Sequence, residues 1–390
     1  MKSYKFRIYP NKNQETALIF TLNTCRHLYN DALAQRKHQA ELNRLYDYFQ
    51  VFPWGTPDWI NYYDQEAELV RNKTKYQKRA YSQVLQNVLR RVERSFKNFF
   101  NGAGYPRFQG RNRYDSFTFP QSGFKITDDG KLKLSKIGEI RIFQHREIEG
   151  KIKTCTIKRD VDSWYVSFSV EMYAQQPLEP TGQIVGVDVG LKSLVTLSNG
   201  NQIEPPKYFR QSEKKLAKAQ KGLSRKKKGS SNRNKQRTEV ARIHRHIRNQ
   251  RKDFAHKVSR GLVDAYDVIV FEKLQIKNMI KNHHLSKSIM DAGWYQLIEY
   301  TKYKAEYAGK IVKRVDPKRT SMECSVCGYI QKMPLSQRTY DCPVCGLELD
   351  RDHNAAINIL HKSVPTDSGD FKPVGDGLLG LSMKQEALLL

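Results

Sequence analysis

The chain has 390 residues, enough for two or three domains with separate cores, and it carries 68 lysines and arginines against 40 acidic residues. A formal net charge of +28 favours nucleic acid as the partner, because cationic side chains release the counterions condensed on its phosphates. No apolar run approaches the roughly 20 residues of a membrane helix, and the N-terminus is not signal-like. We therefore expect no membrane association and a location in the prokaryotic cytosol.

The first part of the chain predicts a β-barrel with a helical insertion. Apolar and charged residues alternate over residues 3–9, which indicates a half-buried strand. Helical spacing follows from about Gln14 and again over 83–99, and the aromatic-rich stretch 46–63 between them indicates an irregular connector or a recognition loop. Short alternating runs then predict strands at 117–119, 124–126, 132–134, 140–142, 152–157 and 164–170. We expect residues 1–10 and 104–178 to form the barrel, and 11–103 a helical domain inserted in it.

A different, α/β architecture is expected after a proline-containing linker at 175–182. The predicted elements are strands at 184–189 and 193–197, a turn at Asn199-Gly200, and a basic helical region from 208 to about 265 interrupted at 229–232. Further on come strands at 267–271 and 310–315 and helices at 291–308 and 354–361. The apolar stripe of the basic region, from Val240 to Leu262, is expected to dock on a sheet. Residues 365–390 lack periodicity and are expected to be disordered.

Two CxxC pairs predict a metal site. Cys324 and Cys327, followed by Cys342 and Cys345, have the spacing of a zinc ribbon, in which tetrahedral zinc takes sulfur from two facing turns. The alternative is a pair of disulfides, which is typical of secreted proteins. We expect a structural Zn²⁺ held by all four cysteines in a ribbon spanning 321–348.

Three acids stand at positions where a carboxylate needs a binding partner. Asp188 and Glu272 each end an apolar strand, and Asp352 lies near the start of a helix. If they converge, their oxygens suit a pair of Mg²⁺ ions, whose chemistry is phosphodiester hydrolysis. Each acid also has an ordinary structural explanation: a strand-end hydrogen bond for Asp188, an ion pair with lysine for Glu272, and a helix N-cap for Asp352.

These motifs together resemble the TnpB family of transposon-encoded RNA-guided endonucleases, relatives of type V CRISPR effectors. The matching segments are Gly186-Val-Asp-Val-Gly190, Phe271-Glu272, Asp291-Ala-Gly-Trp294, Thr320-Ser321, Cys342-Pro-Val-Cys345-Gly and Asp350-Arg-Asp-His-Asn354.

The resemblance implies a multidomain α/β and β-barrel protein. Its parts would be an RNase H-like (RuvC) nuclease domain at 183–320 and 349–364 with an inserted zinc ribbon that binds target nucleic acid, and a wedge β-barrel interrupted by a helical recognition domain. It also implies a metal-dependent DNA endonuclease that cuts double-stranded DNA next to a short motif. The guide would be an RNA from the transposon end, and the protein a monomer in a ribonucleoprotein.

Within that resemblance, the family's acid-X-Asn-Ala spacing selects Asp352 as the third catalytic acid after Asp188 and Glu272, with Asp350 as the alternative. Asp316 is a weaker candidate for a metal-proximal acid. Arg338 is an auxiliary candidate that could stabilise phosphate charge, although a solvated ribbon arginine is the ordinary explanation. The candidate nucleic-acid contacts are amide and basic side chains: Gln83, Gln86, Asn87, Lys226, Lys227, Arg242, Arg245 and Arg248.

Two other functions are compatible with these motifs. One is an RNA-guided or ribbon-based DNA-binding repressor that does not cleave, although the chain keeps all three acids. The other is an RNase H-like transposase that joins DNA ends with the same chemistry.

Overall fold

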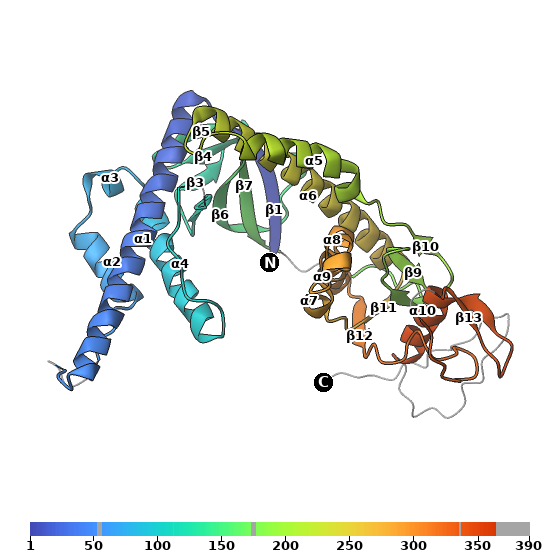
Figure 1. The fold of residues 1–390 in the computed structure, drawn as a ribbon. Coiled ribbons are helices and arrows are strands. Elements are labelled where there is room, and N and C mark those ends of the chain that lie inside the picture. The colour runs from blue at the N-terminus through green and yellow to red at the C-terminus, as the bar shows by residue number, and fades with distance from the viewer. Residues whose placement is uncertain (53–56, 112, 173–176, 335–336, 364–390) are drawn as a thin grey trace. The chain divides into compact units, whose positions relative to one another are not determined.

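A computed structural model describes residues 1–52, 57–111, 113–172, 177–334 and 337–363. The chain forms two compact units, Met1–Ala174 and Gln175–Leu390, each with its own core (Figure 1). The boundary falls at the start of the predicted linker. The tail predicted to be disordered, 365–390, lies outside the described residues. Among the described helices, none combines the length and apolar character needed to cross a membrane.

The first unit contains a seven-stranded antiparallel sheet in the order β2-β6-β7-β1-β5-β4-β3. The opening strand β1 lies between β7 and β5, which are far away in sequence, so the prediction that it pairs with the later strands is confirmed. The strands are β1 (Lys2–Tyr9), β2 (Ser116–Phe119), β3 (Phe124–Ile126), β4 (Lys131–Leu134), β5 (Gly138–Phe143), β6 (Lys151–Asp160) and β7 (Ser163–Glu171).

This sheet curls around one apolar core. Tyr4, Phe6 and Ile8 alternate along β1 and are all buried in it. The rings of Phe124 in β3 and Phe168 in β7 lie 6.4 Å apart, although β1, β5 and β4 separate these two strands in the sheet. Over the described residues the hydrogen-bonded ladder nevertheless ends at β2 and β3. The predicted barrel is therefore a strongly curled sheet, in which the described parts of the edge strands β2 and β3 do not pair with each other.

The described helices of this unit are α1 (Lys12–Tyr48) and α4 (Ser82–Phe100), which contact the sheet, and α2 (Tyr62–Arg71) and α3 (Lys75–Lys78), which pack against α4. Asn11 and Gln14 form a reciprocal capping box that begins α1. The apolar faces of α1 and α4 belong to the same core as the sheet. The predicted irregular connector is shorter than expected, because α1 continues to Tyr48 and α2 begins at Tyr62.

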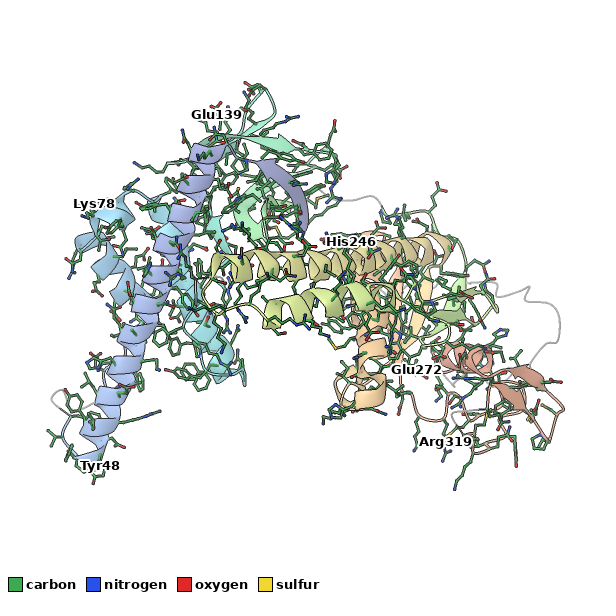
Figure 2. The ribbon with its side chains drawn as sticks, turned by 45° about the horizontal axis from the view of Figure 1, so that its top comes forward. Tyr48, Lys78, Glu139, His246, Glu272 and Arg319 are labelled. Atoms are coloured by element: carbon green, nitrogen blue, oxygen red, sulfur yellow. The ribbon has the colours of Figure 1, made fainter. Side chains whose placement is uncertain are left out.

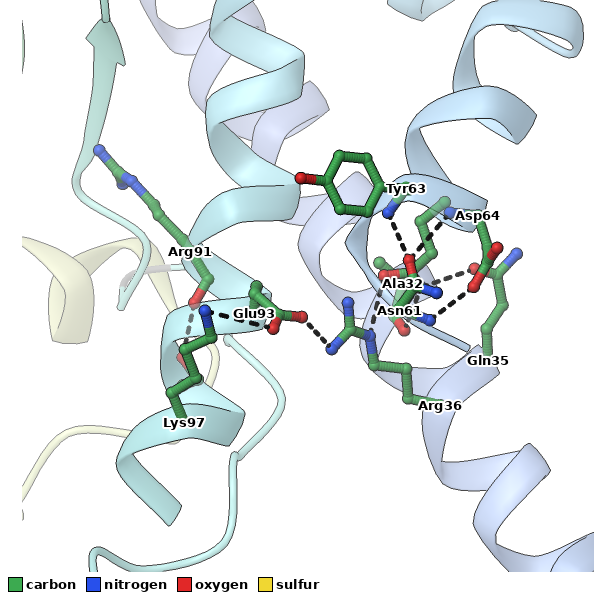
Figure 3. Close-up of polar contacts among 11 residues, drawn as sticks. Ala32, Gln35, Arg36, Asn61, Tyr63, Asp64, Arg91, Glu93 and Lys97 are labelled. Carbon is green, nitrogen blue, oxygen red and sulfur yellow. Dashed lines mark hydrogen bonds and ion pairs between the residues drawn. The ribbon is translucent and has the colours of Figure 1, made fainter. Parts of the chain in front are cut away.

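A buried arginine joins three of these helices (Figure 3). Arg36 of α1, 8% exposed, donates to Gln65 of α2 over 3.0 Å and pairs with Glu93 of α4 over 2.8 Å. Gln65 in turn donates to the carbonyl of Ala32. A charge so far from water depends on these partners, because removal of one leaves the other uncompensated.

We expect Glu93→Ala to lower the free energy of unfolding of this helical block by about 3 kcal/mol, because it leaves the buried Arg36 guanidinium without its anionic partner. Hydrogen exchange of peptides from α2 and α4 would measure the local free energy of opening. Lys97→Ala is the matched control. Its ammonium, 72% exposed, also pairs with Glu93, and its loss should cost less than about 0.5 kcal/mol. Equal effects of the two substitutions would contradict the assignment.

The second unit is built on a five-stranded mixed sheet in the order β10-β9-β8-β11-β12. Strands β8, β11 and β12 are parallel, whereas β9 and β10 continue from β8 as an antiparallel meander. The bounds are β8 (Ile184–Asp188), β9 (Val195–Leu197), β10 (Gln202–Ile203), β11 (Val268–Glu272) and β12 (Ile311–Val315). β10 was not anticipated from the sequence, since a two-residue strand gives no periodicity.

The basic helical region forms two helices, α5 (Tyr208–Ser224) and α6 (Ser231–Ala265), separated close to the predicted break. Ser230 caps α6, and the Arg233 guanidinium fastens the intervening loop by donating to the carbonyls of Leu223 and Lys226. The prediction that the stripe docks on a sheet is wrong for its first half. There, Ile243 and Ile247 pack against α5 in a separate core, and only the later part of α6 reaches the main core.

Three shorter helices precede β12: α7 (Ile276–Met279), α8 (His283–Ala292) and α9 (Trp294–Tyr307). The helix predicted over 291–308 corresponds to α9, whereas α8 before it was not predicted from the sequence. Gly293 separates them, and its φ of +66° is readily adopted only by glycine.

Candidate metal-binding sites

Two of the three candidate acids end neighbouring parallel strands. Val187 of β8 lies opposite Phe271 of β11, so the next residues, Asp188 and Glu272, stand at the same edge of the sheet. Glu272 is only 9% exposed, and its Oε1 accepts a hydrogen bond from the Thr320 hydroxyl. The parallel pairing therefore brings together two carboxylates that are far apart in the sequence.

The third acid comes from α10 (Arg351–His361), which packs directly on β8. A Cβ placed on Gly186 would lie 2.1 Å from the carbonyl oxygen of Ala356, so only glycine permits this approach. A Cβ on Gly190 would lie 3.8 Å from Asp352 Oδ2, which places that carboxylate just beyond the end of β8. Figure 2 labels Glu272 beside this helix in the second unit.

Asp350, the alternative third acid, has another role. It is the N-cap of α10, and its Oδ1 accepts from the backbone N–H groups of Asp352 and His353 over 3.0 and 3.2 Å. The capping role considered for Asp352 is thus filled by Asp350. Asp352 has its carboxylate directed to the sheet edge.

The pKa values of all three acids are raised, chiefly by burial. Burial, followed by the negative charges of Glu272 and Asp352, raises the pKa of Asp188 well above its usual range. Burial raises the pKa of Glu272, and burial together with the charge of Asp350 raises the pKa of Asp352. A cluster of carboxylates that each resist ionisation is an arrangement that a cation would stabilise.

The four cysteines form a tighter group. Their sulfur atoms all lie within 4.8 Å of one another. Within the described residues, no other group of three or more His, Cys, Asp or Glu side chains is gathered in this way, and the three acids are not either. Sγ of Cys324 lies 3.6 Å from that of Cys345, and the sulfurs of Cys327 and Cys342 lie 3.4 Å apart. Because a disulfide holds its sulfurs about 2.05 Å apart, the disulfide alternative is excluded. The cluster could hold a metal ion.

Buried asparagines connect this cysteine cluster to α10. Asn354 accepts from the backbone N–H of Ser325, which lies inside the first CxxC turn, and donates to the carbonyl of Glu323. Asn358, one turn further on, donates to the carbonyls of Thr320 and Glu323. Thr320 is also the donor to Glu272. The segment that leads into the cysteine cluster therefore contacts both a candidate acid and the helix that carries another.

Sequence reasoning did not assign these roles to Thr320, Asn354 and Asn358. The signal available was the pair of asparagines four residues apart, which lie on one face of a helix. Both are buried, at 0% and 5% exposure.

The tight contact of β8 with α10 gives a stability prediction. Gly186→Ala should destabilise the second unit by about 3 kcal/mol or more, because its methyl group would overlap the backbone of α10. The shift of the urea midpoint measures this. Gly261→Ala, at an open position in α6, is the control and should stabilise by about 0.5–1 kcal/mol. A Gly186→Ala protein as stable as the parent would contradict the packing described here.

Comparison with known proteins places the chain in a family. It is 34% identical over 378 residues to "Putative RNA-guided DNA endonuclease InsQ" of Escherichia coli (strain K12), an alignment that covers 92% of each chain. The family model OrfB_IS605, described as "Probable transposase", matches residues 167–283, and a Cas12f1-like TNB domain model matches 294–359. The chain belongs to the TnpB family.

Other relatives of this TnpB protein have names of the same kind. A Streptomyces pristinaespiralis protein named "Putative RNA-guided DNA endonuclease" is 35% identical over 97% of this chain and 92% of its own length. The "CRISPR-associated endodeoxyribonuclease Cas12f1" of Sulfoacidibacillus thermotolerans is 27% identical over 51% of this chain and 50% of its own. A helix-turn-helix domain model matches residues 1–44, which here form β1 and most of α1.

Two further candidates of the TnpB chain, Arg338 and Asp316, are both exposed. Arg338 is exposed, but its charge acts on Asp352 and lowers the pKa of that acid against the effect of burial. Asp316 is exposed and accepts a hydrogen bond from the backbone of Lys318, so it belongs to a loop.

The amide and basic candidates lie apart from the acids in the chain. Gln83 accepts from Ser122, so its side-chain oxygen has an internal partner, whereas Gln86 and Asn87 are half-buried. The basic candidates belong to the α5–α6 region: Lys226 and Lys227 in the loop, and Arg242, Arg245 and Arg248 on α6. Their contacts with nucleic acid stay a prediction.

Proposed function

We propose that this TnpB-family protein is an RNA-guided endonuclease that hydrolyses phosphodiester bonds of double-stranded DNA next to a short motif. The observation that carries the proposal is the placement of Asp188, Glu272 and Asp352 at one edge of the second sheet. The names of the relatives, two of which align over nearly the whole chain, support the same activity.

The second unit fits an RNase H-like, RuvC-type nuclease domain. Numbered within the unit, its strands follow the order 3-2-1-4-5, with strands 4 and 5 parallel to strand 1. Acids at the ends of strands 1 and 4, with a third on the last helix, are what the family resemblance predicts. The first unit would supply the wedge and recognition domains, at the predicted boundaries of 1–10 with 104–178 and of 11–103.

The three carboxylates fit Mg²⁺, because hard divalent cations take oxygen ligands and offset the burial and the neighbouring negative charges that raise the pKa of Asp188. A pair of ions is proposed here, because two-metal hydrolysis of phosphodiesters uses such a pair. When bound, such ions supply an activated water and stabilise the leaving oxygen. Thr320 holds Glu272 in place, and Arg338 supports the charge of Asp352.

Zinc is the metal that best fits the cysteine cluster. Tetrahedral Zn–S bonds of about 2.3 Å place sulfurs about 3.8 Å apart, close to the 3.4 and 3.6 Å separations here. Four thiolates leave no open position, so the ion would be structural. The strand β13 (Thr339–Asp341) leads into the second cysteine pair, and β14 (Glu348–Asp350), which pairs with it, carries the chain from this cluster into α10.

The basic α5–α6 region would hold the RNA and its heteroduplex through backbone and shape, so that sequence is read by base pairing. The guide would come from the transposon end, and the protein would act as a monomer in the ribonucleoprotein.

The test is to sequence the RNA that copurifies with the expressed protein, and to assay cleavage of matching and mismatched DNA with Mg²⁺. Breaks that require both the RNA and a matching target support the proposal. Strand-transfer products would instead support a transposase, the activity by which the matching family model is described. RNA-dependent binding without breaks would support a repressor.

A further inference from the structure

An exposed group of aromatic rings ends α4 in the first unit. Phe96, Phe99, Phe100 and Tyr105 form a connected set, here named the aromatic platform. Centroids lie 5.8 Å apart for Phe96 and Tyr105, 5.1 Å for Phe99 and Tyr105, and 5.4 Å for Phe99 and Phe100. Phe100 is 77% exposed and Tyr105 41%. Rings held against one another yet open to water offer their outer faces to a further planar group.

The platform is rigidly supported. Arg36, which the three-helix network fixes, lies over the Phe96 ring at 5.3 Å from its centroid. The loop that follows Tyr105 is fastened to α1, because Asn30 and Gln109 exchange two hydrogen bonds of 3.0 and 2.8 Å. Support of this kind lowers the ordering entropy that a ligand must overcome.

The charge near the platform in the sequence is mostly positive. Between Glu93 and Asp115 every charged residue is basic, namely Arg94, Lys97, Arg107, Arg111 and Arg113, and Glu93 itself is paired with Arg36 and Lys97. Aromatic faces within a basic surface are the combination that binds single-stranded nucleic acid, through base stacking and phosphate contact. A second exposed ring pair in the same unit, Tyr48 and Phe49, lacks this setting, since Glu41 and Asp47 accompany Arg44 nearby in the sequence.

We propose that the aromatic platform stacks unpaired bases of the DNA strand that is displaced when the duplex opens. A displaced strand differs in sequence at every target, and stacking tolerates any base. A guide scaffold of fixed sequence would favour hydrogen bonds to base edges, but the side-chain amides of Asn30 and Gln109 have internal partners: Asn30 bonds to the backbone of Gln109, and Gln109 donates to the carbonyl of Arg107. The proposal rests on the proposed function only for the identity of this strand.

The test measures binding of fluorescent oligo(dT) to the full-length protein loaded with its copurified RNA, in a Glu272→Gln background so that cleavage plays no part. We expect Phe100→Ala/Tyr105→Ala to weaken oligo(dT) binding about 10- to 100-fold, as loss of stacking predicts. The salt dependence should persist, because the phosphate contacts remain. Phe100→Trp/Tyr105→Phe should restore binding, and Tyr48→Ala/Phe49→Ala should leave it unchanged.

Three outcomes would overturn the proposal. Unchanged oligo(dT) affinity in Phe100→Ala/Tyr105→Ala would show that the rings do not stack bases. Weaker retention of the copurified RNA in that variant would assign the platform to RNA. A dimeric parent that becomes monomeric on the substitution would assign it to a second copy of the chain. Because the experiment measures oligo(dT) binding and not cleavage, its result can be interpreted even if the protein shows no guided cleavage.

Discussion

Glu272→Gln should reduce DNA cleavage at least about a thousandfold, because loss of a carboxylate proposed to bind the metal removes several kcal/mol of stabilisation at about 1.4 kcal/mol per factor of ten. The substitution keeps the size of the side chain and an oxygen that can accept the Thr320 hydrogen bond. RNA retention should therefore stay close to that of the parent. Cleavage of end-labelled target DNA by the copurified ribonucleoprotein gives the rate, and sequencing of the retained RNA gives the binding control.

The matched control is Asp316→Asn. Asp316 also follows a parallel strand of the same sheet, but its side chain is exposed and serves a loop hydrogen bond. Cleavage should remain at the parental rate. If Glu272→Gln still cut DNA normally, or if Asp316→Asn abolished cleavage, the assignment of the three acids would be wrong.

Cys342→Ser should release the ribbon metal and also abolish cleavage. Ligation of structural zinc contributes on the order of 10–16 kcal/mol in zinc-finger peptides, so the ribbon cannot hold its fold without it. Asn354 and Asn358 would then lose the backbone partners that fix α10, and Asp352 would lose its placement at the sheet edge. Elemental analysis of the purified protein measures the zinc, and the cleavage assay measures the consequence.

Two further variants separate metal loss from misplacement of the acid. Val344→Ser changes an exposed residue between Cys342 and Cys345 and should keep both zinc and cleavage. Asn354→Ala should keep zinc but slow cleavage about 10- to 100-fold, as loss of a supporting hydrogen bond does at metal sites. Its rate should recover partly at higher Mg²⁺, which a general loss of stability would not produce. Full activity of zinc-free Cys342→Ser protein would show that the ribbon does not position Asp352.

Local patterns were sufficient for most elements. The strand β1 and the break between α5 and α6 could both be predicted from the sequence, because each depends only on residues that are close together in the chain. The helix boundary at Gly293 was harder to predict. It depends on a positive φ, and a single glycine within a helical pattern does not by itself indicate one. The stripe of α6 was identified correctly, but its partner could not be, because α5 competes with the sheet for the same apolar surface.

The candidate residues of both sites were predictable from local sequence: four cysteines at ribbon spacing, and carboxylates at the ends of apolar strands. Which acid faces the sheet was decided only by the tertiary structure, because Asp350 and Asp352 differ by two positions and the helix cap takes one of them. The close approach of α10 at Gly186 and the attachment of the ribbon through Asn354 were also decided there. Contacts between residues far apart in the chain depend on how elements pack, and periodicity describes only one element at a time.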